Sequence, residues 1–94
     1  MAYRIAWMFS KGLHPSYEAS MSMVFVSEIV RRIANAGMRI LGHYGELDRD
    51  SKWTVMNARM MRLCLSSLSI GVGGGSNEIQ RNIIAMRGLG LPRK

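Results

Sequence analysis

The chain has 94 residues, enough for one small domain and too few for a large active site enclosed by its own residues. Its 13 Lys and Arg outnumber 6 Asp and Glu, and the net charge of +7 suits an anionic partner such as nucleic acid, a membrane surface or a nucleotide cofactor. Because the arginines are spread along the chain, a basic, solvated surface is the simplest interpretation. A lone cysteine, Cys64, excludes an internal disulfide and suits a reducing compartment.

The opening residues predict a short helix over residues 2–11. Its aromatic and aliphatic side chains surround Arg4 and Lys11, so the helix is apolar nearly all round and needs a covering partner. Arg4 interrupts the apolar core that a secretory signal requires, and no small-residue cleavage site follows. No apolar run approaches the roughly 20 residues that span a bilayer. We therefore expect a cytoplasmic protein without a membrane segment.

The longest helical pattern covers residues 17–41 and follows an extended link at His14-Pro15, with Ser16 as a candidate N-cap. Two apolar stripes run along it. The first comprises Met21, Phe25, Ile29, Ile33, Ala36 and Ile40, and the second comprises Met23, Val26, Val30, Gly37 and Leu41. Two apolar sides need two packing partners, so we expect either a central position in a bundle or a subunit interface, and a homodimer or higher oligomer.

A glycine-punctuated, charged loop is expected over residues 42–50, with Asp50 or Ser51 capping the next helix. That third helix is predicted over residues 52–69. Its apolar face comprises Trp53, Met56, Met60, Leu63, Cys64 and Ser67.

A glycine run then leads into a fourth helix, predicted over residues 76–88. Ser76 can cap it and Glu78 places negative charge in its first turn. The sequence thus predicts an all-α fold: one domain over residues 1–94, built as an up-down bundle of about four helices.

Common site patterns are missing from the sequence. The glycine run lacks the lysine of a phosphate-binding loop and breaks the dinucleotide fingerprint at Ser76, so by itself it predicts a hinge between helices. His14 and His43 have no metal-ligand spacing to Cys64 or to carboxylates, and no metal site is predicted. The spread of basic residues and the lack of any DNA-binding motif argue against a nucleic-acid partner.

The last segment carries a more specific signal. Its string GGSNEIQRNIIAMRGLGLPR, residues 74–93, resembles the closing motif of the acyl-CoA dehydrogenases, flavoenzymes that oxidise the Cα–Cβ bond of acyl thioesters. EASMSMVFVSEIVRRIANAGMRILGHYG, residues 18–45, is similar to the long helix and turn of that family's C-terminal domain, and RIAWMFSKG, residues 4–12, fits the helix before it. The resemblance implies an all-α domain that forms half of an FAD site across a subunit interface, in fatty acid metabolism.

The family pattern EGT(N/S)(E/Q)IQR implies roles for individual positions. In many members its glutamate removes the Cα proton while the β-hydride passes to flavin. Gly75 and Ser76 match Gly-Thr, and Gly74 stands at the glutamate position, so the resemblance assigns no catalytic residue here. It implies that Ser76, Asn77 and Glu78 contact FAD and that Gly75 lies beside the substrate thioester.

A second family pattern, Q-x-x-G-G-x-G, maps to RILGHYG at residues 39–45 and contacts the FAD of a neighbouring subunit. Arg39 replaces the glutamine and could pair with a pyrophosphate with charge assistance. His43 replaces the second glycine and adds a side chain where glycine permits close approach.

Two hypotheses of different class follow. The first is the C-terminal helical bundle of an acyl-CoA dehydrogenase-like flavoprotein, a fragment or truncated member that is inactive alone. It would need the missing flavoprotein domains and would meet acyl-CoA only in a complete assembly. The second is a stand-alone helical module for oligomerisation or interaction, without catalysis. A basic nucleic-acid-binding helical protein is a third, weaker alternative.

Overall fold

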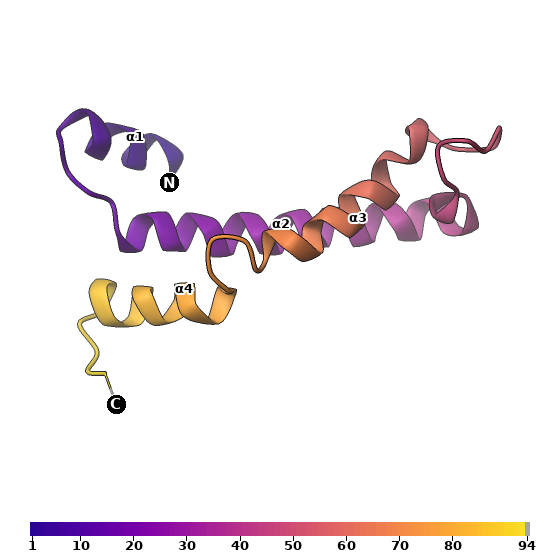
Figure 1. Ribbon diagram of the computed structural model, residues 1–94. Helices are drawn as coiled ribbons and strands as arrows, with labels where there is room; N and C mark the ends of the chain where they lie inside the picture. Colours follow the sequence, from indigo (N-terminus) through magenta and orange to yellow (C-terminus); the bar gives the residue numbers. More distant parts are fainter. Residues whose placement is uncertain (94) are drawn as a thin grey trace. The chain divides into compact units, whose positions relative to one another are not determined.

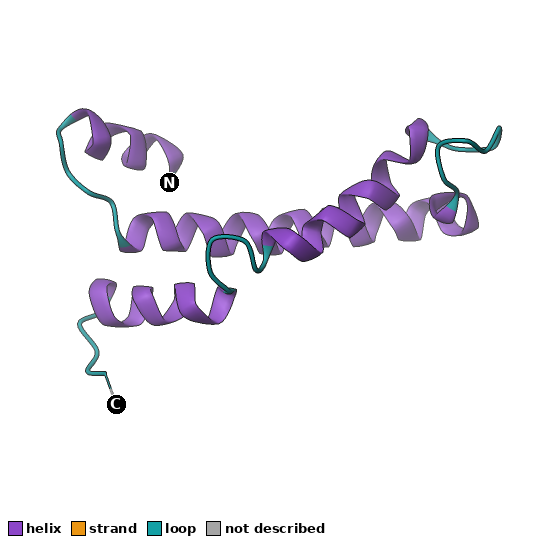
Figure 2. Ribbon diagram, in the orientation of Figure 1, coloured by secondary structure: helices purple, strands orange, loops and turns teal. Residues whose placement is uncertain are grey.

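The computed structural model describes residues 1–93, and the regular structure in this range is entirely helical (Figures 1 and 2). The α-helices are α1 (Ala2–Ser10), α2 (Tyr17–Leu41), α3 (Arg59–Ile70) and α4 (Asn77–Ile83). Three short helical turns accompany them: η1 (Gly42–Glu46), η2 (Met56–Ala58) and the π-helical turn η3 (Ile84–Gly88), which continues directly from α4. The prediction of an all-α fold with about four helices is confirmed. No helix in this range is long and apolar enough to cross a membrane.

The chain divides into two compact units. The first unit comprises Met1–Val26 together with the described residues from Gly74 onward, and the second comprises Ser27–Gly73. Helix α2 contributes its N-terminal part to the first unit and its remainder to the second.

In the first unit, polar contacts fix the start of α2. Glu18 is only 4% exposed, and its Oε1 lies 3.4 Å from Nη2 of Arg4 on α1. Arg87 of η3 donates from Nη1 to Oγ of Ser16, at 2.6 Å. A hydrogen bond to Glu18 and the charge of its carboxylate raise the pKa of Tyr17 above its ordinary value of 10.0. These bonds tie α1 and η3 to the same end of α2.

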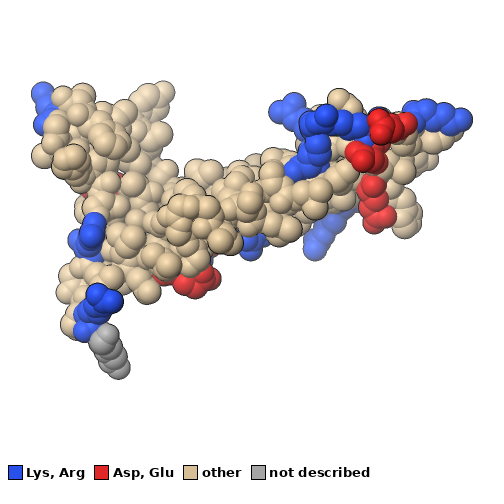
Figure 3. All heavy atoms as spheres, in the orientation of Figure 1, with Lys and Arg blue, Asp and Glu red and all other residues tan. Residues whose placement is uncertain are grey.

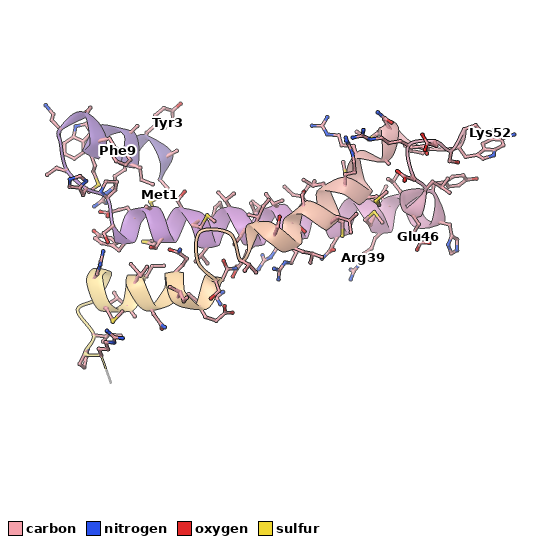
Figure 4. All side chains as sticks on the ribbon, in the orientation of Figure 1. Met1, Tyr3, Phe9, Arg39, Glu46 and Lys52 are labelled. Atoms are coloured by element: carbon pink, nitrogen blue, oxygen red, sulfur yellow. The ribbon has the colours of Figure 1, made fainter. Side chains whose placement is uncertain are left out.

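Helix α1 buries none of its residues. Tyr3 is 93% exposed, and Figure 4 shows Tyr3 and Phe9 projecting from the helix. The sequence-based expectation that this helix is apolar nearly all round agrees with the structure, which leaves large side chains on its surface.

In the second unit, small residues bring α2 and α3 together. Ala34 and Ser27 on α2 are buried, as is Ser67 on α3. A Cβ on Gly37 would lie 2.5 Å from Sδ of Met60, so a larger residue at position 37 would force the Met60 side chain to shift. The core of this unit is therefore built from small side chains in close approach, which dispersion forces favour at high packing density.

The two predicted stripes of α2 have different surroundings. Most of the second stripe is half-buried, whereas the first stripe remains largely on the surface. The exposed members of the first stripe are Met21, Phe25, Ile29, Ile33, Ala36 and Ile40. Apolar surface of this extent on one helix indicates a face that another molecule or segment covers.

The third helix begins later than predicted, at Arg59 rather than near Lys52. Met56, Asn57 and Ala58 all have positive φ, near +50°, and Ala58 is the N-cap in place of the predicted Asp50 or Ser51. The cause lies upstream, where Asp48 organises a local turn: its carbonyl accepts from the Ser51 N–H, at 3.1 Å, and from the hydroxyl of Thr54. Such local bonds compete with helical ones.

Charged residues surround this turn. Figure 3 shows acidic and basic side chains side by side where η1 leads toward α3. Nζ of Lys52 lies 5.2 Å from the ring centroid of Trp53, a cation–π contact. The predicted loop at residues 42–50 is thus partly ordered, because its first five residues form η1.

Candidate functional site

The glycine turn before α4 adopts a backbone that requires glycine. Gly74 has φ +78° and Gly75 has φ +107°, values that residues with a Cβ rarely adopt. A Cβ on Gly74 would meet only Cε of Met23, at an ordinary 3.8 Å. Backbone conformation, and not lack of space, is therefore what restricts position 74 to glycine.

Ser76 starts α4 as predicted. Its extended backbone (φ −61°, ψ 157°) ends the turn, and its Oγ accepts a hydrogen bond from the Ile79 N–H at 3.4 Å. Its carbonyl accepts the first helical bond, from the Gln80 N–H at 3.0 Å. Asn77 is half-buried and Glu78 is exposed in the first helical turn. The predicted N-cap is confirmed, and a side-chain oxygen satisfies one open amide of the helix.

Gln80 is a residue of this site that sequence reasoning missed. It is buried, and its Nε2 donates to the Gly74 carbonyl at 2.9 Å, from the helix back to the turn. A Cβ on Gly75 would lie 3.0 Å from the same Nε2. The sequence signal was its place one helical turn after Ser76, where an amide side chain can reach the preceding loop.

The second candidate segment lies in the second unit, at the end of α2 and in η1. Arg39 is exposed in the last turn of α2 and projects from it (Figure 4). Gly42 has φ +56°, and a Cβ there would meet no atom within 4 Å. Gly45 is buried, and a Cβ on it would lie 3.2 Å from atoms of both Leu41 and Met38.

His43 takes part in a shallow aromatic pocket. The pocket holds about 290 Å³ and is lined by His43, Tyr44, Leu47 and Trp53. His43, Tyr44 and Trp53 are all exposed. The imidazole that stands in place of a glycine is thus part of a concave wall next to the turn.

The predicted site residues fall into two groups. Gly75, Ser76, Asn77 and Glu78 are consecutive in the first unit, whereas Arg39 and His43 belong to the second. Within residues 1–93, no three His, Cys, Asp or Glu side chains gather so as to hold a metal ion. Cys64 is half-buried, and its Sγ lies 3.8 Å from Oδ1 of Asn35.

Comparison with known proteins identifies the family. Residues 1–89 match the model of the acyl-CoA dehydrogenase C-terminal domain. The chain is 37% identical over 76 residues to acyl-CoA dehydrogenase FadE26 of Mycobacterium tuberculosis, a match that covers 81% of this chain and 19% of that protein. It is 32% identical over 93 residues to acyl-CoA dehydrogenase IpdE1 of the same organism, covering 99% and 23%. The chain therefore belongs to the acyl-CoA dehydrogenase family, whose C-terminal domain it carries.

Solved structures agree with this assignment. The ChsE4-ChsE5 complex from Mycobacterium tuberculosis matches with 33% identity and a TM-score of 0.86, over 98% of this chain and 24% of that one. The Tcur3481-Tcur3483 steroid ACAD matches with 23% identity and a TM-score of 0.89, again over 98% and 24%, a likeness of fold. The chain spans about a fifth to a quarter of the length of these relatives. The first of these structures is a complex of two named chains, and the second carries two component names.

Proposed function

We propose that this chain supplies an FAD-contacting end of the flavin site in an FAD-dependent acyl-CoA dehydrogenase. The observation that carries the proposal is the turn at residues 74–76, where two left-handed glycines and an N-capping serine stand at the family's closing motif. Glycines leave the backbone bare, so a large planar ligand can approach its amides closely. FAD, when bound, would accept the β-hydride of an acyl thioester.

The residues after the turn fit such a ligand. Ser76 is half-buried beside Gly75, and its backbone is held by the cap geometry. Asn77 carries both a donor and an acceptor, and Glu78 carries two acceptor oxygens, which suit the hydroxyl and amide groups of a flavin nucleotide. We propose that Ser76, Asn77 and Glu78 contact FAD and that Gly75 faces the substrate thioester.

The same segment offers no base for removing the Cα proton. Gly74 has no proton-accepting side chain, and its left-handed φ disfavours any residue that has one. Glu78 lies among the proposed FAD contacts, so it is not assigned to proton transfer. We therefore propose that residues 74–78 bind FAD and position the acyl thioester, and that a carboxylate from outside this segment removes the Cα proton.

The second segment is proposed to contact the FAD of a neighbouring subunit. The exposed Arg39 guanidinium can pair with a pyrophosphate, and the open space at Gly42 admits a ligand to the backbone. His43 narrows that approach because its ring stands where the family has a glycine. We propose accordingly that FAD binding at residues 39–45 depends more on the charge of Arg39 than on close approach to the backbone at Gly42.

A second acyl-CoA dehydrogenase chain is the proposed partner. The exposed stripe of α2 needs a cover, and a 33% identical relative is found in a complex of two named chains, ChsE4 and ChsE5. Either a second copy of this chain or a different chain of the family would bury Phe25, Ile33 and Ile40, whose large exposed area favours association.

Flavin titration of the assembled flavoprotein tests the proposal. We expect Ser76→Ala to weaken FAD binding about fivefold to tenfold, because it removes both the cap and a contact, worth about 1 kcal/mol or more. Ser69→Ala is the matched control, since Ser69 is exposed and its Oγ bonds only within its own helix, to the Ser66 carbonyl. An assembly that takes up no FAD at all would favour a purely structural module.

A charge-reversal variant tests the second segment separately. Arg39→Glu should raise the FAD Kd. Added salt should weaken FAD binding by the wild type more than FAD binding by the variant, because salt screens the proposed ion pair. If Arg39→Glu binds FAD as tightly as the wild type at every salt concentration, Arg39 does not contact the pyrophosphate.

A further inference from the structure

Gln80 makes a side-chain hydrogen bond from helix α4 back to the glycine turn. The residue is 9% exposed, and its Nε2 lies 2.9 Å from the Gly74 carbonyl, six residues earlier. The backbone N–H of Gln80 is already used in the helix, where it bonds the Ser76 carbonyl. The side-chain amide is thus free to hold the turn, and a buried amide without a partner carries a desolvation cost.

Gly75 and Gln80 are fitted to each other. A Cβ on Gly75 would lie 3.0 Å from Nε2 of Gln80, closer than most Cβ atoms approach a neighbour, so the Gln80 amide would have to move. The absent side chain at Gly75 is therefore the space that the Gln80 amide uses to reach the Gly74 carbonyl.

Fixing this carbonyl fixes a whole peptide unit. The Gly74–Gly75 peptide is trans, because the described chain contains no cis peptide bond, and in a trans peptide the N–H points opposite to the C=O. With its carbonyl turned toward Gln80, this peptide directs the Gly75 N–H away from the Gln80 side chain. Two glycines in sequence would otherwise sample many orientations, since glycine loses the most conformational freedom on ordering.

We infer that Gln80 is the positioning residue of the proposed flavin site, acting through the Gly74–Gly75 peptide that it holds. This inference rests on the proposed function, in which Gly75 to Glu78 face FAD and the thioester. Gln80 itself touches neither; it sets the direction in which the turn presents its backbone.

The test uses the assembled flavoprotein with FAD as the probe. Gln80→Leu removes the donor, and we expect the FAD Kd to rise about tenfold, the effect of losing one buried hydrogen bond. Amide hydrogen exchange at residues 74–77 should accelerate in the same variant before FAD is added. Asn82→Leu is the matched control, because it makes a similar change at an exposed position of the same helix and should alter neither quantity.

Gln80→Glu keeps the size of the side chain and supplies a pH readout. Burial raises the pKa of the introduced carboxyl above its ordinary value of about 4.3, so the group is protonated at mildly acidic pH. The protonated carboxyl can donate to the Gly74 carbonyl, whereas the ionised carboxylate repels it. At about pH 5, Gln80→Glu should bind FAD with a Kd close to that of the wild type. At about pH 8, its Kd should be higher than that of the wild type.

The outcomes separate the inference from the function beneath it. Tenfold weaker binding in Gln80→Leu, with the pH-dependent recovery of Gln80→Glu, supports the inference. Wild-type FAD binding that both variants reproduce at all pH values overturns it and leaves the proposed function standing. A wild-type assembly that binds no FAD overturns the proposed function and the inference together. If Gln80→Leu does not fold, the pH profile of Gln80→Glu decides alone.

Discussion

The two glycine turns of this chain differ in what holds their backbones in place. At residues 74–76, the Gly75 backbone fits against a buried Gln80 amide and a serine caps the following helix. At residues 42–45, Gly42 faces open space and the next residue is His43, which lines an open pocket. The closing turn is held by a side-chain hydrogen bond and a helix cap, whereas the earlier turn is closely packed at Gly45 but open at Gly42. A residue at a motif position is therefore a stronger candidate for ligand contact where neighbouring side chains fix its backbone.

The largest expected effect is a loss of stability, which a matched pair of glycine substitutions compares between the two turns. Gly75→Ala combines a φ of +107° with a Cβ only 3.0 Å from Gln80, whereas Gly42→Ala has positive φ alone. We expect Gly75→Ala to destabilise the protein by about 2–4 kcal/mol, and Gly42→Ala by about 1–2 kcal/mol from backbone strain. Denaturant unfolding of the assembled protein measures both values. Equal losses would mean that the two turns are built alike.

Gly74→Glu puts the usual family base back into the closing turn. Its φ of +78° opposes any side chain, so we expect a loss of about 1–2 kcal/mol and no gain in acyl-CoA oxidation. Gly74→Ala controls for the backbone strain, and single-turnover flavin reduction by an acyl-CoA measures the chemistry. Faster reduction in Gly74→Glu than in Gly74→Ala would contradict our view that this turn positions ligands only.

His43→Gly should strengthen FAD binding at the earlier turn. Removing the imidazole restores the close approach that the family pattern has, and we expect FAD to bind a few-fold more tightly to the assembled protein. The gain is small because a new glycine adds chain entropy, a cost of up to about 1 kcal/mol. His14→Gly, at another exposed histidine, is the control in the same titration. Weaker binding in His43→Gly alone would show that the imidazole itself makes a contact.

The smallest expected effect concerns the pH dependence of the first unit. The pKa of Tyr17 is raised by Glu18, so the contribution of this pair to stability is fully present below pH 10.0 and is lost as the pH rises through the higher folded-state value. Ultraviolet titration should find one tyrosine that ionises above its ordinary pKa, and Tyr17→Phe should remove it. Persistence of that late titration in Tyr17→Phe would assign it to another tyrosine.

Much of the fold follows from periodicity and punctuation. Helix α2 occupies its predicted residues because its apolar pattern is long and unbroken, and α4 starts after Ser76 because that serine is a strong cap. The start of α3 could not be predicted, since the bonds around Asp48 and the left-handed residues 56–58 carry no periodic signal. Apolar periodicity that extends back to residue 52 shows only that these residues could form a helix, not that they do.

The site was partly predictable for a similar reason. The closing motif identified the family and the candidate contacts at residues 75–78, because the spacing of glycine, serine and acid is distinctive. Gln80 escaped notice, since its importance depends on a bond to a backbone carbonyl that only the folded turn brings within reach. The exposure of the first α2 stripe was equally hidden, because apolar periodicity does not say whether a partner belongs to the same chain.

Amide hydrogen exchange of the assembled flavoprotein, with and without FAD, tests the central claim most directly. The account predicts strong FAD-dependent protection at residues 74–78 and weaker protection at residues 39–45, following the difference in how the two turns are held. Protection confined to residues 39–45, or none at residues 74–78 in a protein that has bound FAD, would contradict it.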